Sequence, residues 1–139
     1  MICTNVGEGM KPLTKIASGG EMARIMLAIK NVLADVDAVG TLVFDEIDTG
    51  ISGKAGQAVG EKMKEIAQNH QVICITHLPS IAAKGDYNYY IHKQTKENKT
   101  YTNIKQLTEE ETIEEIARIS SGEITEIAKA HARELRKAS

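Results

Sequence analysis

Two short apolar runs, separated by an amphipathic segment, most strongly constrain how this 139-residue chain folds. Residues 41–44 and 71–76 are both rich in β-forming side chains. Between them, apolar residues recur at helical spacing: Ala55, Val59, Met63, Ile66 and Ala67. Strand, helix and strand in this order predict a parallel βαβ unit with a right-handed crossover. Because continuous apolar strands are typical of the middle of a parallel sheet, we expect both strands to be buried.

A helix is predicted upstream of the first strand. Its apolar residues fall at i, i+3, i+4, i+7 and i+11: Met22, Ile25, Met26, Ile29 and Leu33. Ser18 is placed as the N-cap of this helix, with Glu21 three residues later as in a capping box. Residues 1–17 contain Gly7, Gly9 and Pro12, and we expect a strand end followed by a loop.

The second half of the chain predicts a helical turn at residues 80–83, a hairpin and two helices. The hairpin strands are placed at residues 87–94 and 100–107, around the polar tract 95–99. The helices are indicated by two apolar sets, one at Ile113, Ile116 and Ala117, the other at Ile124, Ile127, Ala128, His131 and Leu135. The acidic run Glu109–Glu111 suits the N-terminus of the first of them. The expected fold class is α/β, in a single domain over residues 1–139.

Composition narrows the class of protein. A hydrophobic fraction of 42%, a charged fraction of 26% and a net charge of −2 are ordinary for a globular domain. They give no global electrostatic reason to expect nucleic acid as a direct ligand. Cys74 lies in an apolar run as a small hydrophobe, and neither it nor Cys3 has zinc or redox spacing. No apolar run reaches the roughly 18–20 residues of a membrane span, so we expect a protein of the reducing cytoplasm.

Two acids directly follow the first apolar strand. Asp45 and Glu46 are thereby placed at the carboxyl edge of the sheet, where open α/β folds bind ligands. In phosphoryl transfer to water, one carboxylate commonly holds Mg²⁺ and a second orients and deprotonates the water. Asp45 is then the metal ligand and Glu46 the base. The alternative is a strand that simply ends in a polar loop.

His77 follows the second apolar strand and is predicted at the same edge, within reach of a γ-phosphate. A histidine with a structural hydrogen bond is the alternative. His70, His92 and His131 share no ligand spacing with it, which argues against a histidine metal site. Upstream, Ser18-Gly19-Gly20 at a helix start predicts an anion site, because glycines allow close approach and free N–H groups favour a phosphate. Ordinary capping is the alternative.

The order of these elements resembles the second half of an ABC-type ATPase. Residues 16–21 (IASGGE) look like the signature motif and residues 41–46 (TLVFDE) like the Walker B strand. Residues 47–50 (IDTG) look like the D-loop and His77 like the switch histidine. Within this class, residues 15–21, 24–30, 44–53 and 76–79, together with 115–119 and 131–135, are similar to the RecN family of SMC-like ATPases. The resemblance covers nearly the whole chain.

The resemblance implies a site shared between two heads of a homodimer. Ser18, Gly19, Gly20 and Glu21 act in trans on the γ-phosphate of ATP bound by the partner head. Asp45, with Mg²⁺, Glu46 and His77 act in cis, and Asp48 links the two sites. The implied function is ATP binding and hydrolysis during double-strand-break repair and recombination, in the bacterial cytoplasm near the nucleoid, with DNA as a partner of the intact protein and no membrane.

Two family features are missing from the sequence. It contains no G-x-x-x-x-G-K-[ST] P-loop and no heptad segment long enough for a coiled coil. In the family, both precede the region that this chain resembles. We therefore expect Met1 to begin an excised segment, an N-terminal P-loop lobe to be a partner, and the chain alone to lack ATPase activity.

Two other functions remain open at this point. A transporter nucleotide-binding half is one, although such signatures usually have glutamine at the position of Glu21. The other is a non-catalytic DNA-binding or interaction module, for which Lys93, Lys96 and Lys99 of the predicted hairpin are the best feature. A solvated hairpin tip explains the same lysines.

Overall fold

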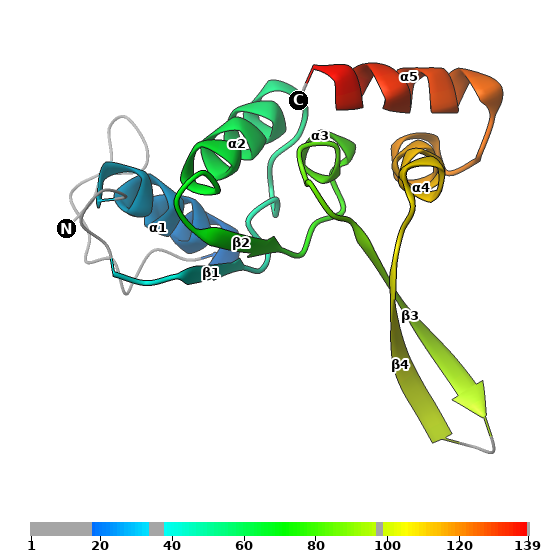
Figure 1. The fold of residues 1–139 in the computed structure, drawn as a ribbon, viewed down its shortest axis with the longest axis horizontal. Helices are drawn as coiled ribbons and strands as arrows, with labels where there is room; N and C mark the ends of the chain where they lie inside the picture. The colour runs from blue at the N-terminus through cyan, green and yellow to red at the C-terminus, as the bar shows by residue number, and fades with distance from the viewer. Residues whose placement is uncertain (1–17, 34–37, 97–98, 139) are drawn as a thin grey trace. The chain divides into compact units, whose positions relative to one another are not determined.

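A computed structural model describes residues 18–33, 38–96 and 99–138 of the chain (Figure 1). It divides into two compact units, residues 1–76 and 77–139, and each is described by itself. The strand end and loop expected within residues 1–17 lie outside the described residues, as do Ile16 and Ala17 of the signature-like motif. The prediction of a single domain stays a prediction.

The first unit is a parallel βαβ arrangement preceded by a helix. Its elements are α1 (Gly19–Leu33), β1 (Thr41–Phe44), α2 (Gly53–Ile66) and β2 (Gln71–Cys74). Strands β1 and β2 pair in parallel, from Thr41 opposite Gln71 to Phe44 opposite Cys74. This confirms the predicted parallel βαβ unit, with β2 ending two residues earlier than the apolar run suggested. The right-handed sense of the crossover stays a prediction.

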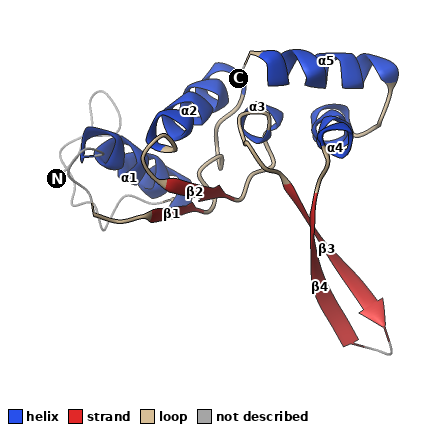
Figure 2. Ribbon diagram, in the orientation of Figure 1, coloured by secondary structure: helices blue, strands red, loops and turns tan. Residues whose placement is uncertain are grey.

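Only one face of this two-stranded sheet is buried. Leu42 and Phe44 are buried in the unit, as are Leu27 of α1 and Met63 of α2. Val43 on the opposite face is 64% exposed and its neighbour Ile73 is 46% exposed. The prediction that both strands are fully buried was wrong for the described residues. Figure 2 shows α1 and α2 beside the two strands.

Helix α1 begins as its sequence predicts. The backbone N–H of Glu21 donates to Ser18 Oγ over 3.2 Å, and the N–H of Met22 donates to the Ser18 carbonyl over 3.1 Å. Ser18 is therefore the N-cap, which satisfies one of the donors that a helix start leaves free.

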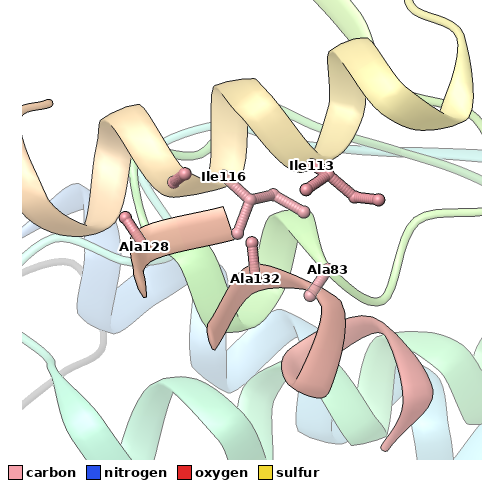
Figure 3. Packing of buried hydrophobic residues seen from close by; sticks show 6 residues of the cluster. Ala83, Ile113, Ile116, Ala128 and Ala132 are labelled. Atoms are coloured by element: carbon pink, nitrogen blue, oxygen red, sulfur yellow. The ribbon is translucent and has the colours of Figure 1, made fainter. Parts of the chain in front are cut away.

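The second unit consists of α3 (Pro79–Ala82), β3 (Tyr89–Lys96), β4 (Lys99–Gln106), α4 (Glu109–Ser121) and α5 (Glu126–Lys137). Its core joins α3, α4 and α5 through small and branched side chains (Figure 3). The members of this core are Ala83, Ile113, Ile116, Ala117, Ala128 and Ala132. Alanines on α5 allow the helix to approach the isoleucines of α4 closely.

Both ends of helix α4 are capped. Thr108 Oγ1 accepts the N–H of Glu111, and the Glu111 carboxylate accepts the N–H of Thr108, which forms a capping box. At its C-terminus, Gly122 takes φ +80°, a left-handed conformation that glycine adopts without steric cost. The acidic run is thus a helix N-terminus, as predicted.

The β3–β4 hairpin is antiparallel, with Ile91 opposite Ile104 and Lys96 opposite Lys99. Within its unit it extends away from the three helices as a twisted two-stranded ribbon (Figure 1). Its strands run through most of the tract that the sequence assigned to the loop. Among the described residues, no helix has the length and apolarity that a bilayer crossing requires.

Candidate functional site

The site is built on the turn that follows β1. Glu46 takes φ +59°, in the left-handed region that residues with a Cβ rarely occupy. The N–H of Thr49 donates back to the Glu46 carbonyl over 3.0 Å, which closes the turn. Ile47 is fully buried, while the side chains of Asp45 and Glu46 are exposed. The buried isoleucine anchors a turn whose two carboxylates face solvent.

The glycine start of α1 lies directly against this turn. A Cβ built on Gly20 would lie 2.8 Å from the Glu46 carbonyl oxygen and 2.9 Å from that of Thr49. A Cβ on Gly19 would collide with Oε2 of the Glu46 side chain. Glycine is needed at position 20 because the obstacles are backbone atoms, which no side-chain rotation removes. The signature-like and Walker B-like segments are thereby brought together within one unit.

Arg24, one helical turn further along α1, stabilises the same contact. Its Nη1 donates to the carbonyl oxygens of Ile47 over 3.0 Å and Thr49 over 2.9 Å. Two charge-assisted hydrogen bonds from a single guanidinium nitrogen hold the turn to the helix start. This contact was not predicted from the sequence, in which Arg24 stands out as a charge beside the apolar stripe of the helix.

Asp48 connects the turn to the end of β2. It is only 2% exposed, and its Oδ2 accepts a hydrogen bond of 2.6 Å from the Thr76 hydroxyl. Burying a carboxylate is costly unless it is hydrogen-bonded, so this contact is part of what keeps Asp48 in place. Thr76 is a second residue that the sequence analysis missed. The role of Asp48 across a head–head interface stays a prediction.

The thiol of Cys74 lies near the carboxylates of the turn, which affect its pKa. Burial, followed by the carboxylates of Asp48 and Asp45, raises the pKa of its thiol to about 12. All three causes disfavour the thiolate. Cys74 is therefore an inert thiol, consistent with its prediction as a small hydrophobe, although it is only half-buried.

The remaining predicted residues lie as follows. Within the described part of the chain, no three side chains of His, Cys, Asp or Glu gather as a metal site. The role of Asp45 as a metal ligand stays a prediction. Glu21 contributes its backbone N–H to the Ser18 cap. His77 is exposed and follows Thr76 directly, but it belongs to the second unit. Its predicted position beside Glu46 stays a prediction.

Comparison with known proteins gives a consistent result. No family model matches the chain. The DNA repair protein RecN of Bacillus subtilis is 46% identical over 138 residues, which is 99% of this chain and 24% of that protein. RecN of Halalkalibacterium halodurans is 47% identical over 96% of this chain, and RecN of Deinococcus radiodurans is 46% identical over 94%. This chain is a homologue of RecN.

The chain spans about a quarter of the length of the RecN relatives that it matches. A solved structure of an SMC ATPase, studied for ATP-driven dimerisation and DNA-stimulated activation, has a TM-score of 0.54. The match covers 83% of this chain and 68% of that structure, at 23% sequence identity. The fold predicted from the sequence, the α/β C-terminal lobe of such an ATPase head, is thereby confirmed. RecN relatives also favour this family over a transporter half.

Proposed function

We propose that this chain is the signature and Walker B part of a RecN-like ATPase head that acts in double-strand-break repair. The observation that carries the proposal is the backbone contact of Gly20 with Glu46 and Thr49. It joins two segments that the family resemblance assigns to nucleotide chemistry. The RecN names of the relatives and the SMC ATPase fold support the same function.

The start of α1 supplies an anion site for a phosphate. The first N–H groups of a helix have no partner within the helix, and its dipole places partial positive charge there. Ser18 Oγ accepts the Glu21 N–H, which leaves its own O–H proton for a phosphate oxygen. Ser18, Gly19, Gly20 and Glu21 together would cover the γ-phosphate of ATP held by the P-loop lobe of a partner head. ATP bound this way stabilises a homodimer, because both heads contact it.

The exposed acids after β1 supply the hydrolytic chemistry. Glu46 accepts a proton from the attacking water, and His77 donates a hydrogen bond to the γ-phosphate. Asp45 would hold Mg²⁺, which in nucleotide sites usually has one or two carboxylates, waters and phosphate oxygens as ligands. A single exposed carboxylate at the strand end fits that pattern. When bound, Mg²⁺ neutralises charge on the phosphate oxygens. Asp48 positions the turn from its buried contact with Thr76.

A chimera tests this proposal most directly. This chain replaces the matching quarter of Bacillus subtilis RecN, which is 46% identical to it. We expect the chimera to hydrolyse ATP and the isolated chain to show no turnover. Glu46→Gln in the chimera should lower kcat by about 100-fold or more, since general bases contribute roughly 10²–10⁴-fold. It should also accumulate an ATP-bound dimer in size-exclusion chromatography.

Glu61→Gln is the matched control, because Glu61 is an exposed glutamate on α2, away from the turn. It should leave kcat within about twofold, as expected for a surface position. Normal turnover by the Glu46→Gln chimera would show that Glu46 is not the base. Turnover by the isolated chain at the rate of the chimera would contradict the division of the site between two lobes.

A further inference from the structure

We propose that one face of the β3–β4 hairpin binds single-stranded DNA. In an antiparallel pair, directly opposed residues lie on the same face, and successive residues alternate between faces. The register therefore assigns each side chain to one of two faces. The described side chains of the tyrosine–lysine face are those of Tyr90, His92, Gln94, Lys99, Tyr101, Asn103 and Lys105. The isoleucine face consists of Tyr89, Ile91, Lys93, Thr95, Thr100, Thr102, Ile104 and Gln106.

The two faces differ in chemistry. The tyrosine–lysine face combines aromatic rings, ammonium groups and two amides, with no carboxylate and no aliphatic side chain among its described members. The isoleucine face has Ile91 directly opposite Ile104, and its other side chains are those of Tyr89, Lys93, Gln106 and three threonines. Among the described residues of the ribbon, only this face carries aliphatic side chains.

The tyrosine–lysine face is accessible to a ligand. Tyr101 is 52% exposed and Tyr90 is 37% exposed. The rings of Tyr90 and His92 are stacked on each other, with centroids 5.4 Å apart, so Tyr101 has the more open outer ring surface of the two tyrosines. Isolated two-stranded hairpins are marginally stable in water, so a ligand on this face would also stabilise the ribbon.

The charge of the hairpin favours an anionic ligand. Residues 87–106 contain four lysines and one glutamate in a chain whose net charge is −2. Lys99 is exposed, whereas Lys105 forms an ion pair with Glu111. The chain as a whole therefore repels a polyanion weakly, and the hairpin is a local exception.

Aromatic rings select the kind of polyanion. Proteins that bind single strands without sequence preference combine positive charge along the backbone with rings on which bases stack. Tyr101 pairs with Gln94, four residues beyond Tyr90, so the two rings are about 13 Å apart along the ribbon. They form two separate stacking platforms. Duplex DNA offers no unstacked base to such rings, and an acidic protein partner does not require them.

Fluorescence anisotropy with a labelled oligothymidine and the purified chain tests the proposal, without ATP. We expect measurable binding at low salt that weakens roughly 10-fold between about 50 and 200 mM salt, as two or three phosphate contacts predict. Duplex DNA of equal length should bind at least several-fold more weakly. No binding to the single strand, or equal binding to the duplex, would overturn the proposal. Since no nucleotide is present, neither result bears on ATP hydrolysis.

Matched variants on the two faces locate the contact. Tyr101→Leu should weaken single-strand binding about 5-fold or more, because stacking contributes roughly 1–3 kcal/mol per base. Tyr89→Leu is its control, since Tyr89 is 58% exposed on the isoleucine face. Lys99→Gln should weaken binding and flatten the salt dependence, while Lys93→Gln on the other face should change both less. Circular dichroism of each variant checks that the chain remains folded. Equal effects on both faces would overturn the assignment.

Discussion

Two arginines show how differently the two units use the same chemistry. Arg24 in the first unit donates to the carbonyls of Ile47 and Thr49, and so fixes the shape of the turn that carries Glu46. Arg136 in the second unit also donates to carbonyls, those of Ala83 and Gly85, but pairs with the Glu109 carboxylate as well. The guanidinium of Arg24 stabilises the turn of the candidate site. The guanidinium of Arg136 stabilises the packing of α5 against α4 and the end of α3.

Side-chain ion pairs extend this contrast. In the second unit, Lys129 pairs with Glu114 over 2.7 Å and Arg133 pairs with Glu110 over 3.1 Å, both from α5 to α4. These pairs surround the isoleucine and alanine core. In the first unit, the key contacts are backbone carbonyls approached by glycine and arginine. Both units have a buried apolar core. We infer that the second unit adds ion pairs between its helices to that packing, whereas the first adds a close backbone fit.

The largest effect is expected at the centre of the second unit. Ile116 is 1% exposed in the α4–α5 core, and Ile116→Ala should lower the free energy of unfolding by about 2–5 kcal/mol, through lost burial and a residual cavity. Urea unfolding with hydrogen exchange in α4 and α5 measures it. Ile127→Ala is the control, since Ile127 is 85% exposed. A loss below about 1 kcal/mol would contradict a packing-based unit.

A smaller effect is expected from the backbone fit of the first unit. Gly20→Ala places a methyl group within 2.8 and 2.9 Å of two carbonyl oxygens, so α1 or the turn must shift. Overpacking of this kind costs about 1–3 kcal/mol, measured by urea unfolding. Gly40→Ala has nothing within 4 Å and serves as the control. If the two variants unfold alike, the contact does not define this unit.

The smallest effect concerns the Glu109–Arg136 pair, which is exposed on its acidic side. The hydrogen bond from Arg136 holds the pKa of Glu109 below its usual value. The pair therefore stabilises the folded chain at pH values above the usual pKa of a glutamate. This stabilisation is lost as the pH falls through the lowered pKa of Glu109 in the folded chain. Glu109→Gln should lower the free energy of unfolding by less than about 1 kcal/mol at pH 7. In strong acid it should not lower the free energy of unfolding.

The urea midpoints of unfolding of the Glu109→Gln variant and of the unchanged chain, measured across a range of pH, check this expectation. The two midpoints should converge in strong acid. Glu123→Gln, on an exposed residue after α4, should show no such convergence. If the Glu109→Gln variant were still less stable than the unchanged chain in strong acid, the carboxylate would not be the stabilising group.

Local patterns predicted much of this structure. The helical spacing of Met22, Met26 and Ile29, the Ser18 cap and the order of strand, helix and strand all have counterparts in the fold. These features depend on residues a few positions apart, where spacing and side-chain chemistry suffice. The carboxylates after β1 were placed for the same reason.

Contacts between distant segments could not be predicted in this way. Arg24 reaches Ile47 and Thr49 across more than 20 positions, and Thr76 reaches Asp48 across 28. No local pattern says which carbonyl an arginine will bind. The exposure of Val43 was missed for a related reason, since an apolar run does not reveal how many faces of its strand are covered.

The contact at Gly20 also limits how this molecule can evolve. Most close contacts join two side chains, so a change on one side can be compensated by a change on the other. At Gly20 the opposing atoms are the carbonyl oxygens of Glu46 and Thr49, which every amino acid carries alike. No second substitution restores the lost space. A side chain at position 20 therefore cannot be accommodated by changing the side chain of residue 46 or 49, because their carbonyl oxygens stay in place.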